Sequence, residues 1–147
     1  MPHGLAVQVV ADEPIVAAVC VEEVLAGGAA GSVSLASVAE LAVITLPVGT
    51  GLRACVDAGY AAVGLRPRVA FEASDPRMLA RLAARGLGLA FLPASVAAAY
   101  GDGLRVLTIS EPGMRGRLGL AWCTEGPVGP AARALIAHAR AALPDVS

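Results

Sequence analysis

Residues 43–54 (VITLPVGTGLRA) are expected to form a strand, a glycine turn and the first turn of a helix, a combination that can bind a phosphate or another anion. Gly49, Gly51 and Ala54 stand in G-x-G-x-x-A spacing, and Glu72 follows Gly51 by 21 residues. In nucleotide-binding folds this spacing cradles a pyrophosphate, and the later carboxylate holds a ribose. A dinucleotide site is therefore one interpretation of this turn.

A second interpretation is a simpler anion site. Pro47 and Val48 separate the expected strand from the first glycine, where the dinucleotide fingerprint needs the turn to follow the strand directly. Thr50 begins the expected helix, and the first amides of a helix have no partner within it, so they attract a carboxylate or phosphate. A second such terminus begins at Ser74-Asp75. The alternative without a ligand is self-capping by the side chains of Thr50, Ser74 or Asp75.

The remaining side chains point to no enzyme, metal site or cofactor. No G-x-S-x-G elbow occurs, and the two histidines, His3 and His138, have no evident catalytic partner. No Cys/His pair has the spacing of metal ligands. Arg77, Arg81 and Arg85 form a stripe at helical spacing, which we interpret as a solvated helix face.

Composition excludes several classes of protein. The 147 residues are 56% hydrophobic and carry 11 basic against 12 acidic residues, without the basic excess of a nucleic-acid surface. No uninterrupted apolar run reaches the ~18 residues of a membrane span. The N-terminus has no basic region typical of a signal peptide. Together with isolated Cys20, Cys55 and Cys123, this predicts a cytoplasmic protein with reduced thiols and no membrane contact.

The N-terminal third contains short elements. Leu5–Val10 and Ile15–Val21 are predicted strands, separated by the turn signal ADEP. Residues 26–33 are rich in small residues and read as a linker. Ser34–Glu40 is predicted as a short helix.

From residue 43 onward, strands and helices alternate, which predicts an α/β fold with a largely parallel sheet. The expected strands are Val43–Leu46, Val69–Ala73, Gly88–Pro93, Leu104–Ile109 and Leu118–Cys123. The expected helices are Thr50–Val63, Asp75–Gly86, Ala94–Tyr100 and one from Gly129-Pro130 whose core side is Ala132, Leu135, Ile136, Ala139 and Leu143. Arg53 and Asp57 are predicted to form an exposed i,i+4 pair.

Three ordered stretches resemble a known family. They read SVSLASVAELAVITLPVGTGLR, RPRVAFEASDPRMLARLAARGLGLAFLPASVA and RLGLAWCTEGPVGPAARALIAHARAAL. Together they are similar to the effector-binding domain of LysR-type transcriptional regulators, in register over residues 4–143. This match is far more specific than the glycine turn.

The resemblance implies a fold like the type 2 periplasmic binding proteins, with two lobes of mostly parallel sheets joined by two hinge strands. A small effector binds in the cleft between such lobes. Residues 1–32 and 121–147 correspond to a partial first lobe, and residues 33–120 to the second. Ile15–Glu23 and Leu118–Cys123 correspond to the hinge strands.

The resemblance also implies a function. The chain would be a bacterial regulatory domain and no enzyme, N-terminally truncated, with its first lobe incomplete. The winged helix-turn-helix is absent, so this chain alone is not expected to bind DNA. We expect a homo-oligomer that associates through Thr50–Val63 and Arg68–Ala73, since the strand would lie near a sheet edge.

The family's cleft positions map onto two turns of this sequence, which we expect to bind a small anion such as a carboxylate. The predicted effector-binding residues are Pro47, Val48, Gly49, Thr50, Ala73 and Ser74. The redox cysteines of the peroxide-sensing branch would fall at Gly51 and Tyr60, so a disulfide switch is not supported. The alternatives are a binding protein or enzyme on the same fold, or a nucleotide-binding domain that uses Gly49-Thr50-Gly51.

Overall fold

The structure is a computed structural model that describes residues 4–22, 31–111, 113–126 and 128–146. It divides into two compact units, Glu13–Gly116 and a smaller one formed by Met1–Asp12 with Arg117–Ser147. Strands β1 (Leu5–Cys20) and β7 (Arg115–Cys123) contribute residues to both. The larger unit therefore takes in residues 13–32, which the resemblance assigns to the first lobe. Compact units and family lobes are different divisions, and the lobe assignment stays a prediction.

The described residues form one mixed sheet of seven strands, ordered β2-β6-β1-β5-β3-β4, with β7 paired to β1. The further strands are β2 (Ser32–Val33), β3 (Ala42–Thr45), β4 (Arg68–Glu72), β5 (Leu89–Pro93) and β6 (Leu104–Ile109). Strand β3 runs parallel to β4 and β5, and β2 runs parallel to β6, whereas β1 is antiparallel to β5 and β6. The predicted α/β class is confirmed, with β4 at the sheet edge as expected.

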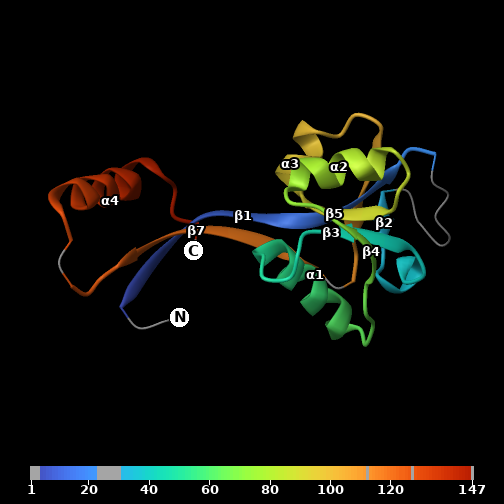
Figure 1. Cartoon of the computed structure of the whole chain (residues 1–147), viewed down its shortest axis with the longest axis horizontal. Helices are drawn as coiled ribbons and strands as arrows, with labels where there is room; N and C mark the ends of the chain where they lie inside the picture. Colours follow the sequence, from blue (N-terminus) through green and yellow to red (C-terminus); the bar gives the residue numbers. More distant parts are fainter. Residues whose placement is uncertain (1–3, 23–30, 112, 127, 147) are drawn as a thin grey trace. The chain divides into compact units, whose positions relative to one another are not determined.

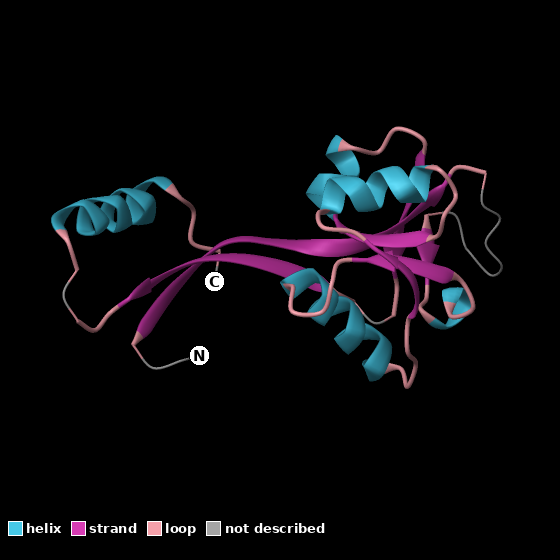
Figure 2. Cartoon of the chain, viewed as in Figure 1, coloured by secondary structure: helices cyan, strands magenta, loops and turns pink. Residues whose placement is uncertain are grey.

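Helices cover both faces of the sheet in the larger unit (Figure 1, Figure 2). Helix α1 (Gly51–Ala62) lies on one face, and α2 (Pro76–Ala84) and α3 (Ala94–Ala99) lie on the other. In the central strands β1, β3 and β5, alternate residues belong to two cores, one on each face of the sheet, as the period of a strand requires. Val43 packs in the cluster that contains Val56 of α1, and Ile44 packs in the cluster that contains Leu79 of α2.

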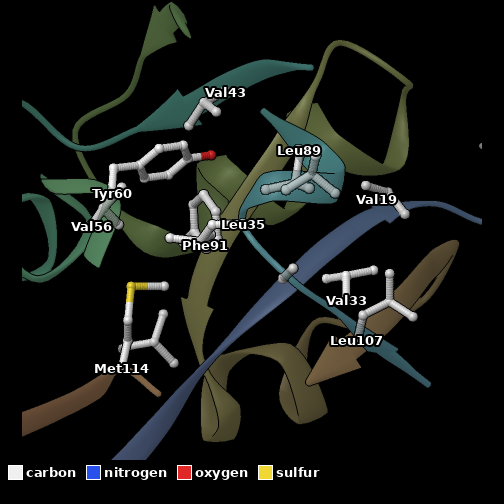
Figure 3. Packing of buried hydrophobic residues seen from close by; sticks show 13 residues of the cluster. Val19, Val33, Leu35, Val43, Val56, Tyr60, Leu89, Phe91, Leu107 and Met114 are labelled. Carbon is white, nitrogen blue, oxygen red and sulfur yellow. The ribbon is translucent and has the colours of Figure 1, made fainter. Parts of the chain in front are cut away.

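The core beneath α1 contains the largest buried side chains (Figure 3). The rings of Tyr60 and Phe91 meet edge to face, with centroids 5.8 Å apart. The Tyr60 hydroxyl has no hydrogen-bond partner within the described residues, and neither has the buried hydroxyl of Thr45. Burial raises the pKa of Tyr60 to about 12.

The N-terminal segment corrects two predictions. Leu5–Val10 and Ile15–Val21 are not separate strands, because β1 runs without interruption through the expected ADEP turn. The turn residues have partners that make an extended backbone favourable. The Oδ2 atom of Asp12 lies 3.3 Å from the Nε atom of Arg117, and the Glu13 carboxylate accepts hydrogen bonds from Ser95. Tertiary contacts thus override the local turn signal.

The segment before β3 contains less helical structure than predicted. Only a 3₁₀ turn, η1 (Ala36–Val38), forms where a helix over Ser34–Glu40 was expected. Ser34 closes this turn through its Oγ, which accepts from the Ser37 amide at 3.2 Å. Most of the expected linker at residues 26–33 lies outside the described residues.

The smaller unit contains α4 (Pro130–Ala142) with parts of β1 and β7. No described residue of α4 is buried, and Leu135 is 68% exposed, so the expected core side of this helix is wrong for this structure. Gln8 of β1 is buried and donates to the carbonyls of Leu143 and Pro144 at 3.1 Å. The helix is thus attached through its C-terminal end rather than through an apolar face.

Candidate functional site

The two predicted turns are neighbours at one edge of the sheet. Strands β3 and β4 are parallel, and Thr45 and Glu72, the last residues of each, are partners in the register. The Ala73 amide donates to the Thr45 carbonyl at 3.1 Å, which holds the two strand ends together. Open α/β sheets bind their ligands at this carboxyl edge. Of the predicted residues, Thr50 and Ala73 are half-buried, and those exposed are Pro47, Val48, Gly49 and Ser74.

Thr50 caps helix α1. Its Oγ1 accepts from the Arg53 amide at 3.3 Å and donates to the Pro47 carbonyl at 2.8 Å. The turn that leads to it needs a left-handed residue, and Gly49 supplies one with φ of 103°. The Thr50 hydroxyl therefore caps its own helix, as the alternative without a ligand predicts. The first amides of α1 still have no partners within the helix.

Asp75, and not Ser74, caps helix α2. The Asp75 carboxylate accepts from the Met78 amide at 3.0 Å, and Pro76 occupies the first helical position, as expected for a helix start. Arg77 lies 3.7 Å from the same carboxylate. Ser74 itself is exposed at the surface beside this capped terminus.

A third helix terminus lies at the same edge, and its cap was not predicted. Helix α3 follows β5 directly, and the Glu13 carboxylate accepts from the Ser95 amide at 3.0 Å and from the Ser95 hydroxyl at 2.6 Å. Glu13 and Ser95 are 82 residues apart in the chain. No local pattern signals such a contact, because it depends on the pairing of β1 with β5.

Arg53 is the second residue of this edge that the sequence did not single out as part of the site. Its Nε donates to both carboxylate oxygens of Asp57, at 3.1 and 3.2 Å. Its Nη1 donates to the Leu46 carbonyl at 3.3 Å and to Glu72 at 3.2 Å. The predicted i,i+4 pair forms, but its arginine is only 13% exposed, because the guanidinium folds back over the end of β3.

The charges around Arg53 favour its cationic form. Burial by itself lowers the pKa of Arg53, but the hydrogen bonds and negative charges of Asp57 and Glu72 outweigh burial and raise that pKa above its ordinary value. Since Glu72 is engaged with Arg53, it is a poor partner for a ribose. This edge of the sheet therefore presents backbone amides and hydroxyls to a ligand, and the carboxylates of Asp57 and Glu72 already neutralise the charge of Arg53.

A cavity of about 260 Å³ lies near the same edge. Its lining comes from residues 14–16 of β1, residues 108–109 at the end of β6 and residues 113–115, which lead into β7. Its lining is mainly apolar and contains Ile15, Ile109 and Met114. None of the six predicted effector-binding residues lines this cavity. Sequence reasoning missed it, because it forms where β1 leaves β6: Ala17 still pairs with Leu107, whereas the Ile15 amide bonds to Met114.

Among the described residues, no cluster of three or more His, Cys, Asp or Glu side chains could hold a metal ion. Within the same residues, none of the helices has the length and apolarity needed to cross a membrane.

The model of the LysR substrate binding domain family matches residues 1–144. No curated protein sequence matches significantly.

Solved structures with similar folds include effector-binding and regulatory domains. The effector binding domain of QuiR in complex with shikimate is 22% identical, with a TM-score of 0.78, over 92% of this chain and 64% of that one. The CcmR regulatory domain of Synechocystis PCC6803 in complex with 2-PG is 20% identical, with a TM-score of 0.79, over 99% of this chain and 71% of that one. CbnR, a LysR family transcriptional regulator, is 20% identical, with a TM-score of 0.76, over 99% of this chain and 50% of that one.

These likenesses show the fold, which is that of the type 2 periplasmic binding proteins. The chain spans about two thirds of the QuiR and CcmR domains and half of CbnR. Because the family model matches nearly the whole chain, this protein belongs to the LysR substrate binding domain family, a family of regulatory effector-binding domains rather than enzymes.

Proposed function

We propose that this domain senses a small anionic metabolite at the carboxyl edge of β3 and β4. Its ligand contacts would come from the predicted residues, which are Pro47, Val48, Gly49, Thr50, Ala73 and Ser74. The observation that carries this proposal is the presence of two helix N-termini, those of α1 and α2, at neighbouring strand ends.

The caps favour α1 as the main anion-binding terminus. Helix α2 is capped by the carboxylate of Asp75 and α3 by that of Glu13, so both termini already face a negative charge. Helix α1 is capped by the neutral hydroxyl of Thr50. Its positive end therefore remains available to a carboxylate or phosphate.

The ligands in the similar structures support this class of molecule. QuiR was solved with shikimate and CcmR with 2-PG. Shikimate is a carboxylic acid that also carries hydroxyls, so it matches a site made of amides and serine or threonine hydroxyls. We infer a ligand of this kind here, and not shikimate itself.

The role of the whole protein is part of the same proposal. The domain would report effector binding to a DNA-binding domain elsewhere in a LysR-type regulator, in the cytoplasm and as a homo-oligomer. The family assignment supports this role. A nucleotide site at Gly49-Thr50-Gly51 is the less favoured alternative, since Pro47 and Val48 separate the strand from the first glycine, where the dinucleotide fingerprint needs a direct turn.

A thermal-shift screen followed by calorimetry tests the proposal. The probes are shikimate, benzoate and inorganic phosphate, with glucose as the neutral control and NAD for the nucleotide alternative. Ser74→Ala should weaken binding of the best anion several-fold, for a loss of roughly 1 kcal/mol per hydrogen bond. Thr124→Ala removes an exposed hydroxyl of the smaller unit and should leave binding unchanged. Stabilisation by NAD alone, or by none of the anions, would refute the anion site.

A further inference from the structure

Arg53 is placed between the two turns of the candidate site. It lies in the first turn of α1, donates to the Leu46 carbonyl just before the Pro47–Thr50 turn, and reaches Glu72 just before Ala73. Its terminal nitrogen Nη2 makes no hydrogen bond within the described residues, although Nε and Nη1 do. The guanidinium therefore has a free donor at the edge where the effector is proposed to bind.

The local charge makes simple addition of an anion unfavourable. Arg53 carries one positive charge and contacts two carboxylates, Asp57 and Glu72. An anion added to this group would be the third negative charge around one guanidinium, and like charges at such distances repel. An anion that replaces one carboxylate keeps the local charge unchanged.

The two carboxylates differ in how firmly they are held. Asp57 uses both oxygens and lies one helical turn from Arg53 on the same helix, so its position is set by α1. Glu72 uses one oxygen and is 47% exposed, so its release into water costs little. Glu72 is thus the carboxylate that can leave.

We propose that an anionic effector replaces Glu72 as a partner of Arg53, an inference that rests on the proposed anion site. With Glu72 gone, Nη1 and Nη2 form the planar fork that binds a carboxylate through two parallel hydrogen bonds. Arg53 is then a specificity-determining residue that selects carboxylates and phosphates over neutral ligands. Because Glu72 ends β4 and Arg53 belongs to α1, the exchange also removes a link between these two elements.

The test uses acetate as the probe and acetamide as its neutral counterpart. Binding is followed by NMR through two signals, the backbone amides of Gly51 and Ser74 and the side-chain Nε–H of Arg53. Glu72→Gln removes the competing charge and should tighten acetate binding about fivefold, the scale of one exposed ion pair. Asp57→Asn is the matched control, since it removes the other carboxylate of the same arginine, and it should change the affinity by less than about twofold. Acetamide should cause no shift.

Arg53→Gln should abolish the acetate-induced shifts, and Arg53→Lys, which keeps the charge without the fork, should weaken binding while the fold is retained. Equal tightening by Glu72→Gln and Asp57→Asn would overturn the exchange, because it would reflect net charge alone. Acetate shifts at Gly51 and Ser74 that persist in Arg53→Gln would also overturn it, yet would leave the anion site intact. Absence of any acetate shift in the wild type and in Glu72→Gln would overturn both.

Discussion

Gly59 of α1 and Met114, just before β7, are packed so closely that a side chain at residue 59 would have to displace the buried Met114 side chain. A Cβ atom at Gly59 would lie 2.3 Å from the Met114 Sδ and 3.0 Å from its Cγ. Met114 is 6% exposed and belongs to the core cluster beneath α1. Its carbonyl accepts from the Ile15 amide, so the backbone at this point is also anchored.

Gly59→Ala is expected to destabilise the protein in spite of the better helix propensity of alanine. Overpacking a core costs about 1–3 kcal/mol, and the propensity gain of about 1 kcal/mol offsets only part of it. Urea unfolding should show a lower midpoint, whereas Gly51→Ala, with no atom within 4 Å of its Cβ, should be neutral or stabilising. Adding Met114→Ala to Gly59→Ala should cost less than the sum of the two single changes. Strict additivity would contradict the contact.

Tyr60→Phe is expected to leave the protein as stable as the wild type at neutral pH, or more stable by about 1 kcal/mol. The reason is that the buried hydroxyl has no partner among the described residues, so its removal abolishes a desolvation cost. Chemical unfolding at pH 7 measures this difference. A loss of more than about 2 kcal/mol would mean that the hydroxyl is hydrogen-bonded.

The same tyrosine predicts a pH dependence. The folded pKa of Tyr60 is raised to about 12 by burial, against about 10 in an unfolded chain. Between these values the unfolded state releases the proton and the folded state keeps it, so stability is complete below pH 10 and falls as the pH rises toward 12. Tyr60→Phe should remove this part of the decline. Tyr100→Phe, a change at an exposed tyrosine, should retain it.

Thr50→Ala should lower the free energy of unfolding by about 1 kcal/mol, since the capping hydroxyl of α1 is lost. Thr50→Ser keeps the cap and should behave nearly as the wild type. Ser74→Ala should stay within about 0.5 kcal/mol, because Ser74 is exposed and Asp75 supplies the cap of α2. A comparison of the three variants shows whether weaker ligand binding comes from a lost contact or from a lower free energy of unfolding. An unchanged stability of Thr50→Ala would contradict the capping role.

Self-association through α1 and β4 stays a prediction. Strand β4 ends the sheet, and Phe71 on it is 46% exposed. The register skips Ala70, which marks a bulge, and bulges at an edge oppose continuation of the strand ladder. We therefore expect packing of the α1–β4 surface rather than a continuous sheet between copies.

Light scattering at tens of micromolar should detect a homo-oligomer. Phe71→Glu should shift it toward the monomer, whereas Arg133→Glu, at an exposed position of α4 in the smaller unit, should have no such effect. A monodisperse wild-type monomer would refute association. An oligomer that tolerates Phe71→Glu would refute this surface as the interface.

Elements whose signals are local could be predicted from the amino-acid sequence. The period of the apolar residues located α1 and α2, and Thr50 and Asp75-Pro76 marked their first turns, because a cap bonds to an amide only a few residues away. The alternation of strands and helices was enough for the α/β class. The quoted motifs were enough for the family, since their order and spacing carry more information than any one turn.

Features that join residues far apart in the chain could not be predicted, because they depend on how the strands pair. The ADEP signal gave way to a continuous β1, because Asp12 and Glu13 find partners at Arg117 and Ser95. The partial burial of Arg53, its bond to Glu72 and the close packing of Gly59 on Met114 depend in the same way on strand pairing across the chain. A sequence pattern records the preference of each residue for its neighbours, whereas the charges and atoms that meet at this edge are brought together by the order of strands in the sheet.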